Sequence, residues 1–379
     1  MRRMKMKYRK MGKTGIEISA LGFGCMRLPE YEKDGKWYID NDLAIPMLRK
    51  AYEYGVNYFD TAYYYCHSNS ERTLGQAVKP FRDKVYLSTK IPLEEVHSKE
   101  DFWGLLKTSL ARLDTDYIDF YHFWALNKNR FDEVVLKYGL IDEAMEAKRQ
   151  GLIRHLSFSF HDDPKVIKYI IDTGKVFSSM LVQYNLLDRK NEEMINYAHD
   201  QGLGVVIMGP VGGGRLASPE NALGEKLNLG SIATYELAFK FVLSNPNVTC
   251  ALSGMENLAV LKKNVQVINN FTSLTTEEQA NLQQALTELQ KFSELYCTGC
   301  KYCNGCPQSI KIDQIFGLYT YYNVYGLTDF AKQAYARYLK NQNVGQIETC
   351  LECGLCESKC PQKLPIIEDL KKVDRVLRT

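Results

Sequence analysis

The chain lacks long apolar segments and a strong excess of charge of either sign. No part of its 379 residues approaches the roughly twenty consecutive apolar residues that a transmembrane helix requires. The net charge is only +3, which gives no reason to expect a nucleic-acid or membrane partner. The basic residues 1–10 run into Gly12 with no apolar segment behind them, so we do not expect a signal peptide. A chain of this length that is 45% hydrophobic can form one large domain and a smaller one.

Cysteine is scarce in the first three quarters of the chain, where only Cys25, Cys66 and Cys250 occur, and abundant near the C-terminus. The other eight of the eleven cysteines form two runs, each followed by proline: Cys297, Cys300, Cys303, Cys306 with Pro307, and Cys350, Cys353, Cys356, Cys360 with Pro361. This spacing is typical of two-cluster ferredoxins, in which the fourth cysteine of each run ligates the other cluster. It therefore predicts two [4Fe-4S] clusters, one held by Cys297, Cys300, Cys303 and Cys360, the other by Cys350, Cys353, Cys356 and Cys306.

Zinc is the alternative for these cysteines, because paired C-x-x-C units also form zinc sites. A zinc ion takes four ligands, and cysteines at every third position followed by Cys-Pro exceed what a zinc ribbon uses. The first run has only Asn304 and Gly305 before its last cysteine, where the second run has three residues, so its cluster geometry departs from the usual pattern. Thiolate clusters are sensitive to oxygen, and we expect a reducing, cytoplasmic location.

Short apolar runs alternate with helical patterns through the first three quarters of the chain. Each run ends in a polar residue or glycine: Ala20–Gly24, Val56–Asp60, Val85–Lys90, Tyr117–His122, Ile153–Ser159, Ser179–Tyr184, Gly204–Gly209 and Val248–Gly254. The alternation predicts an α/β fold, a (β/α)8 TIM barrel. A doubly wound open sheet is the alternative, but glycines 22 and 24 lack the dinucleotide-binding spacing. Residues 8–11 and 16–19 predict a β-hairpin that closes the barrel floor.

Polar residues end six of these strands, and in a barrel the chemistry lies where the strands end. They are Asp60, Lys90, His122, Ser159, Gln183 and Ser253. Hydrophobic packing alone would not select such a set, so we expect them to line a functional site.

Several segments, taken in their order and spacing, resemble the aldo-keto reductase family from about residue 7 to 270. They are the opening Gly12–Gly24, Phe59–Ala62, Ser70–Gly75, the strand bearing Lys90, Tyr117–His122 and Gln183–Asn185. With its cysteine-rich tail, the whole chain is similar to the subgroup that carries a C-terminal two-cluster module.

The resemblance implies a catalytic tetrad of Asp60, Tyr65, Lys90 and His122. Tyr65 would be the general acid, since the family's spacing from Asp60 selects it among three adjacent tyrosines. A phenol titrates near 10 in water, so the ammonium of Lys90 would favour release of its proton, and Asp60 would anchor that ammonium. His122 would donate a hydrogen bond to the substrate oxygen.

The resemblance also implies a nicotinamide cofactor, NADP or NAD. The residues expected to bind it are Ser159 and Gln183 at the carboxamide, Gly212, Gly213, Gly214 and Arg215 near the pyrophosphate, and Ser253, Gly254 and Asn264 at the adenosine end. Glycines allow backbone N–H groups to approach phosphate closely, and Arg215 adds positive charge. The usual residues for the 2'-phosphate are missing around Met255 and Val260, which leaves the choice between NADP and NAD open.

We expect three parts: a barrel over residues 1–272, a bridging helix within 273–296, and a mainly helical ferredoxin-like domain over 297–379.

Hydride carries two electrons and each cluster accepts one. A flavin could therefore divide the pair, a ferredoxin-like or flavoprotein partner could exchange electrons with the clusters, or the clusters could be structural. The favoured function is reduction of a small aldehyde or ketone. The alternative is an electron-transfer protein whose barrel is a docking scaffold or flavin site.

Overall fold

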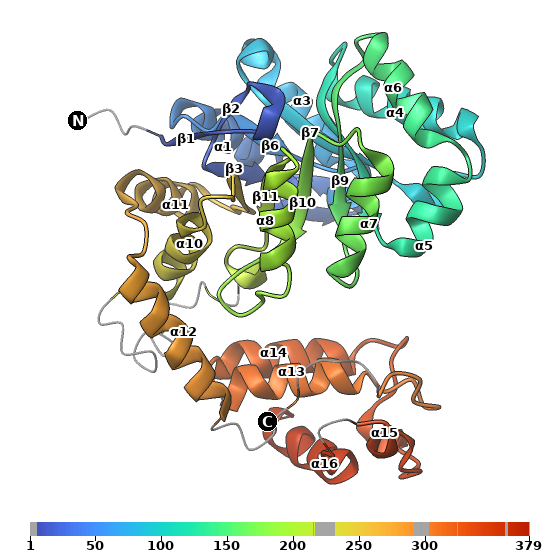
Figure 1. Cartoon of the computed structure of the whole chain (residues 1–379), viewed down its shortest axis with the longest axis vertical. Helices are drawn as coiled ribbons and strands as arrows, with labels where there is room; N and C mark the ends of the chain where they lie inside the picture. The colour runs from blue at the N-terminus through green and yellow to red at the C-terminus, as the bar shows by residue number, and fades with distance from the viewer. Residues whose placement is uncertain are drawn as a thin grey trace. The chain divides into compact units, whose positions relative to one another are not determined.

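The computed structural model describes residues 6–214, 216, 232–291, 297, 303–323, 325–360 and 363–378. These residues divide into two compact units (Figure 1). The first comprises the chain up to Gly214 together with Glu236–Ser273, and the second includes the chain from Leu274 onward. No helix in the described part of the chain is both long and apolar enough to cross a membrane.

Eight parallel strands of the first unit close into a barrel in the order β10-β11-β12-β3-β6-β7-β8-β9. Their bounds are β3 Leu21–Gly24, β6 Tyr58–Asp60, β7 Tyr86–Ile91, β8 Ile118–Leu126, β9 Ile153–Phe160, β10 Ser179–Gln183, β11 Gly204–Met208 and β12 Cys250–Ser253. Each strand falls on one of the predicted apolar runs, and the (β/α)8 fold is confirmed. The strands are mostly buried because one face packs inside the barrel and the other against helices.

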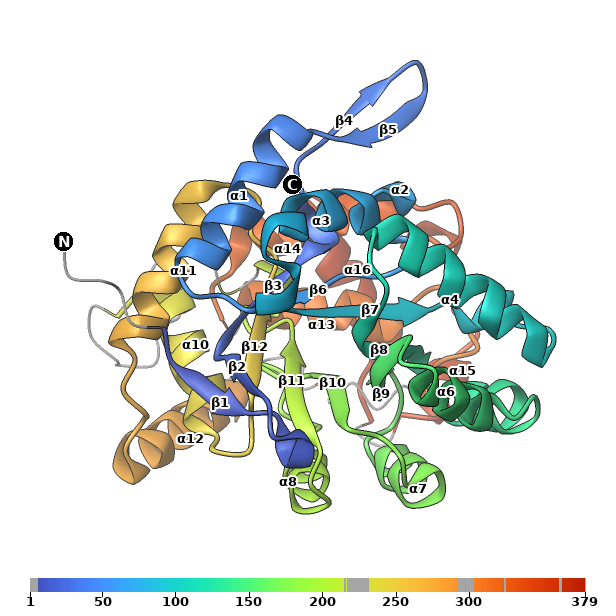
Figure 2. The same ribbon diagram turned by 90° about the horizontal axis from the view of Figure 1, so that it is seen from above.

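Helices surround these strands (Figure 2). Their bounds are α1 Asn41–Glu53, α2 Tyr65–Ser68, α3 Ser70–Val78, α4 Lys99–Leu113, α5 Lys128–Arg130, α6 Leu140–Arg149, α7 Lys165–Gly174, α8 Glu192–Asp200, α10 Thr234–Ser244 and α11 Leu258–Asn270. Capping side chains start several of them. The Asp40 carboxylate accepts from the first backbone N–H groups of α1, and Ser98 and Asp101 form a capping box at α4.

A β-hairpin closes the N-terminal end of the barrel, as predicted. Strands β1 (Tyr8–Lys10) and β2 (Glu17–Ser19) pair antiparallel. Met11 and Ile18 are fully buried in one apolar cluster with inward-facing strand residues such as Tyr58 and Phe120. Lys13 N donates to the carbonyl of Gly202, 2.9 Å away, just before β11. The floor is therefore sealed, and the open ends of the strands lie at the opposite face.

A second hairpin, which we did not predict, lies between β3 and α1. Strands β4 (Glu30–Lys33) and β5 (Lys36–Ile39) pair antiparallel, and the hairpin projects away from the barrel beyond α1 (Figure 2). Most of its side chains are exposed. It follows the C-terminal end of β3, so it belongs to the face of the barrel where chemistry is expected.

The second unit is helical, which confirms the expectation for the tail. Its helices are α12 Thr276–Lys291, α13 Ile312–Asn323, α14 Thr328–Leu339, α15 Leu355–Ser358 and α16 Ile366–Leu377. The predicted helix after residue 275 begins with a capping box: Thr275 Oγ1 accepts from Glu278 N at 3.1 Å, and Thr275 N donates to the Glu278 carboxylate at 2.8 Å.

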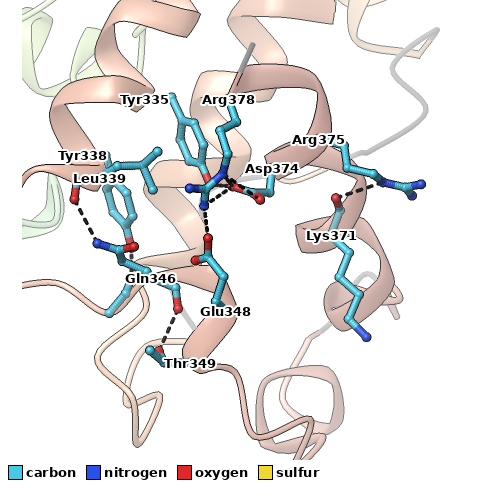
Figure 3. Close-up of polar contacts among 11 residues, drawn as sticks. Tyr335, Tyr338, Leu339, Gln346, Glu348, Thr349, Lys371, Asp374, Arg375 and Arg378 are labelled. Carbon is cyan, nitrogen blue, oxygen red and sulfur yellow. Dashed lines mark hydrogen bonds and ion pairs between the residues drawn. The ribbon is translucent and has the colours of Figure 1, made fainter.

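Polar contacts fasten α14 and α16 to the segment that leads into the second cysteine run (Figure 3). The hydroxyl of Tyr335 on α14 donates to Asp374 on α16. Arg378 pairs with Asp374 at 2.9 Å and also with Glu348, two residues before Cys350. These contacts, around a core that includes Phe316 and Val373, hold the cysteine segment in place.

Candidate active site and iron-sulfur site

A buried ion pair lies at the ends of two neighbouring strands. Lys90 Nζ on β7 is 2.7 Å from Asp60 Oδ2 on β6 and 2.6 Å from the carbonyl of Thr61. The two side chains are 1% and 4% exposed. Ser88 donates to the other Asp60 oxygen, Oδ1, at 2.8 Å. Burial lowers the pKa of Lys90, but the charges of Asp60 and Tyr65 and the hydrogen bonds to them together outweigh it and leave that pKa raised, so Lys90 carries a positive charge.

Tyr65 lies beside this ammonium. Lys90 Nζ is 4.7 Å from the centre of the Tyr65 ring. Burial raises the pKa of Tyr65, and the charge and hydrogen bond of Lys90 lower it in part, leaving it above its ordinary 10.0. The phenol is therefore protonated at neutral pH and available as a proton donor.

The two preceding tyrosines have other partners. The Tyr64 hydroxyl donates to Glu95 Oε1 at 2.5 Å. The guanidinium of Arg112 lies over the Tyr63 ring, with Arg112 Cζ 4.1 Å from the ring centre. Of the three tyrosines, Tyr65 is the one whose ring lies against the Lys90 ammonium.

His122 on β8 is paired in register with Lys90 on the adjacent strand and is completely buried. Neither of its ring nitrogens makes a well-aligned hydrogen bond within the described residues. Burial and the charge of Lys90 lower its pKa to about 3, although the nearby Phe158 carbonyl favours the protonated ring. His122 is therefore a neutral imidazole with unused hydrogen-bonding capacity.

Ser159 and Gln183 lie at the ends of β9 and β10. Ser159 Oγ accepts from the backbone N of Ala125 at 2.7 Å, so its own proton remains free to be donated. Gln183 packs on Gly209, where a Cβ would lie 2.6 Å from Gln183 Oε1. Gly209 also has a φ of +63°, so both space and backbone conformation require glycine there.

The glycines 212–214 form a tight turn with φ values of 58°, 67° and 100°. Arg215, predicted beside them, lies outside the described residues. Another arginine lies at this turn: Arg27 donates to the Gly213 carbonyl at 3.0 Å, and a Cβ on Gly254 would lie 3.3 Å from Arg27 Cδ. We did not predict Arg27. Its position three residues after β3, at a strand end, was the signal that could have found it.

Ser253, Gly254 and Asn264 come together at the end of β12. The amide of Asn264, on α11, donates to Ser253 Oγ at 3.0 Å, and Asn264 is buried. Helix α11 begins at Leu258 after Asn257, whose side chain accepts from Val260 N at 3.0 Å. The N–H of Val260, in the first turn of α11, therefore already has a hydrogen-bond partner within the protein.

In the second unit, cysteines from both runs line one hollow. They are Cys303, Cys306, Cys350, Cys353 and Cys356. In the described part of the chain, no three Cys, His, Asp or Glu side chains are placed to hold a single metal ion. Several thiols around one hollow are the donor set that iron-sulfur clusters take.

The backbone of the second run curls around this hollow. Glu352 and Gly354 have φ values of +53° and +71°, on either side of Cys353. At many iron-sulfur sites, turns that alternate right- and left-handed residues form anion-binding concavities, and left-handed residues next to a cysteine are compatible with such a turn. Cys353 itself is exposed.

Tyr338 joins the two cysteine-bearing segments. Its hydroxyl accepts from Lys311 N at 3.1 Å and donates to the Gly345 carbonyl at 2.7 Å. Cys360 is buried in the tail core, and Cys297 and Cys303 pack against the same core. Cys300, the remaining predicted ligand, lies outside the described residues.

Comparison with known proteins agrees with both units. A model of the aldo/keto reductase family matches residues 20–287, and a model of the 4Fe-4S dicluster domain matches residues 296–364. An uncharacterized oxidoreductase of Bacillus subtilis, YqkF, is 29% identical over 316 residues, covering 73% of this chain and 96% of the relative. L-galactose dehydrogenase of Arabidopsis thaliana is 25% identical, covering 76% and 95%.

Among solved structures, the holo form of aldo-keto reductase AKR11C1 from Bacillus halodurans is similar with a TM-score of 0.64 and 29% identity, covering 74% of this chain and 96% of that one. Fold and matches together define a barrel oxidoreductase with an iron-sulfur module. The chain belongs to the aldo/keto reductase family of NAD(P)-dependent oxidoreductases, and it carries a C-terminal 4Fe-4S dicluster domain. The predicted family and subgroup are confirmed.

The low pKa of His122 predicts a loss of barrel stability in acid. Its folded-state pKa of about 3 is below the ordinary 6.5, so the unfolded chain binds more protons as the pH falls below 6.5, and unfolding is favoured. At pH 5 this should cost about 2 kcal/mol relative to neutral pH. Denaturant unfolding followed by tryptophan fluorescence, with His122→Asn for comparison, should show a smaller pH dependence in the variant. Equal slopes would contradict the assignment.

Proposed function

We propose that the barrel reduces an aldehyde or ketone to an alcohol, with Tyr65 as the general acid. Bound NAD(P)H supplies the hydride. Tyr65 gives its proton to the carbonyl oxygen, and the buried ammonium of Lys90 stabilises the phenolate that is left. The observation that carries the proposal is the Asp60–Lys90 pair, 2.7 Å apart, placed against the Tyr65 ring.

His122 orients the carbonyl in this proposal. A neutral imidazole can donate one N–H to the substrate oxygen, and this oxygen becomes more negative as the carbonyl is reduced. The low pKa of His122 supports the role, because an imidazole without charge does not compete with Tyr65 as the proton source. Trp124, whose ring lies 5.8 Å from those of Tyr64 and Tyr65, adds an aromatic wall beside the acid.

Tyr65→Phe tests the assignment. Removal of the hydroxyl leaves the ring in place but removes the proton donor, so kcat should fall roughly 100- to 10,000-fold. The assay is NAD(P)H oxidation with a panel of aldehydes and ketones, under anaerobic conditions.

Tyr63→Phe and Tyr64→Phe are the matched controls, since their hydroxyls are not set against Lys90, and both should retain most of their turnover. If Tyr65→Phe turned over as fast as the natural chain, the barrel would not use this acid and the scaffold alternative would gain support.

We also propose that Arg27 and the glycine turn 212–214 hold the cofactor's pyrophosphate. The Arg27 guanidinium donates to the Gly213 carbonyl, and its aliphatic stem lies against Gly254. The guanidinium supplies the positive charge for the phosphates. The N–H groups of Gly212 and Gly214 donate to Gly209 and Val211 and hold the shape of the turn. Ser159 and Gln183 would bind the carboxamide, and Ser253, Gly254 and Asn264 would form the adenosine end.

Arg27→Ala should weaken NADPH binding by roughly tenfold or more, because a charge-assisted contact to phosphate is lost. Fluorescence titration of the holoprotein measures the dissociation constant. Arg72→Ala, at an exposed position on α3, is the control and should bind as the natural chain does. The same loss of affinity in both variants would indicate a general charge effect and not a site.

For the second unit we propose two [4Fe-4S] clusters with the ligand sets predicted from the spacing. Their chemistry is the transfer of single electrons. The hollow lined by Cys306, Cys350, Cys353 and Cys356 supports one set, and the exposure of Cys353 would let an external electron partner approach it.

Protein purified without oxygen should contain about eight iron and eight sulfide per chain, and Cys350→Ser should lose about half of each. Cys250→Ser, in the barrel floor, is the control and should keep its full iron content. The visible spectrum of the same samples tests for a bound flavin. Zinc in place of iron would overturn the redox role of the tail.

A further inference from the structure

The turn directly after Tyr65 has a strained backbone. Cys66, His67 and Ser68 have φ values of 50°, 53° and 67°, all in the left-handed region, and none of them is glycine. Residues with a Cβ atom occupy this region singly and at an energetic cost. Three in succession persist only where the surrounding structure holds them, and such strain gathers at functional sites.

Several of the contacts that hold this turn come from the hairpin β4–β5, which was not predicted from the sequence. The Trp37 ring stacks on the His67 ring with centres 5.3 Å apart and planes 13° apart. Glu30 Oε1 is 2.9 Å from His67 Nδ1. The side-chain amide of Asn69 donates to the Trp37 carbonyl at 3.1 Å. We call Glu30, Trp37, His67 and Asn69 the hairpin clasp.

The other side of the turn is anchored to the barrel. Cys66 Sγ lies 3.5 Å from the carbonyl of Cys25, and Asn69 N donates to the Cys66 carbonyl at 3.0 Å. Before the turn, Thr61 is held by Lys90. Tyr65 is thus placed between a segment fixed by the ion pair and a turn whose conformation depends on the clasp.

We propose that Trp37 and His67 are positioning residues for Tyr65. They hold the turn in its left-handed conformation, which keeps the Tyr65 hydroxyl beside Lys90. The proposal rests on the proposed role of Tyr65 as the acid. Trp37 is 43% exposed, so it is not a core residue whose loss would empty the barrel interior.

Trp37→Ala is the first test. Misplacement of a catalytic group by about 1 Å can cost up to about 100-fold, so kcat should fall by roughly 10- to 100-fold while KM and the dissociation constant of NADPH change little. Tyr38→Ala is the matched control: this residue is on the same hairpin and stacks on Tyr31, 5.7 Å away, instead of the turn, and kcat should stay as in the natural chain. A rise in KM with kcat unchanged in Trp37→Ala would overturn the proposal and make the hairpin a substrate contact.

A rescue separates positioning from a general structural role. Glycine adopts left-handed conformations without the Cβ penalty. Ser68→Gly, added to Trp37→Ala, should therefore restore part of the lost kcat, because one of the three left-handed positions no longer carries the Cβ penalty while the Cys66 contact is kept. Failure to restore it, in protein that keeps its circular dichroism spectrum, would overturn the proposal. Should Trp37→Ala not fold, Glu30→Gln weakens the same clasp and is read in the same way.

The two proposals fail in different ways. If Tyr65→Phe retains full turnover, the acid assignment fails. If Tyr65→Phe loses turnover but neither Trp37→Ala nor Glu30→Gln lowers kcat, the acid assignment stands and the clasp does not position it.

Discussion

The buried ion pair between Asp60 and Lys90 is the interaction on which the candidate active site depends. A lone ammonium transferred from water to a protein interior costs several kcal/mol, so Lys90 stays charged only because Asp60 and the Thr61 carbonyl surround it. Ser88 fixes the second oxygen of Asp60, which leaves the carboxylate little freedom to turn. That charge also acts on two neighbours: it lowers the pKa of Tyr65 against the larger effect of burial, and it adds to the larger effect of burial in lowering the pKa of His122.

The two units place different demands on the polypeptide. The barrel builds its site from strand register: Lys90 pairs with His122 on the next strand, and Asp60 pairs with Ser88, two residues before Lys90. The tail places its cysteines on loops, with left-handed residues on either side of Cys353. The barrel site therefore depends on sheet geometry, and the tail site depends on cysteine spacing.

Much of this could be predicted from the sequence, because the signals are local. A strand that is buried on both faces appears in the sequence as an apolar run, and the first polar residue marks its end. Asp60, Lys90 and His122 were found in this way. Cysteine spacing likewise predicted that Cys306 would meet Cys350, Cys353 and Cys356. These four line one hollow, but Cys303, which the spacing assigns to the other cluster, lines it too, so the division into two ligand sets stays a prediction.

The hairpin β4–β5 could not be predicted in the same way, because its strands are short, exposed and rich in charge, and carry no alternating pattern. The left-handed turn at Cys66–Ser68 has no sequence signal either, since glycine is absent and contacts with distant residues impose the conformation. Arg27 was missed because its partners, Gly213 and Gly254, are remote in the sequence and meet only in the closed barrel.

The Tyr338 hydroxyl ties two segments that are far apart in the sequence. It joins the backbone of Lys311, just after the first cysteine run, to that of Gly345, just before the second, and the chain between them folds into α13 and α14. Packing of these helices offsets the entropy cost of closing the loop between the two runs. A zinc finger, by contrast, has its metal as the main link between its ligand-bearing segments. In this tail the polypeptide itself links the two cysteine-bearing segments, so the cysteine ligands are not their sole connection.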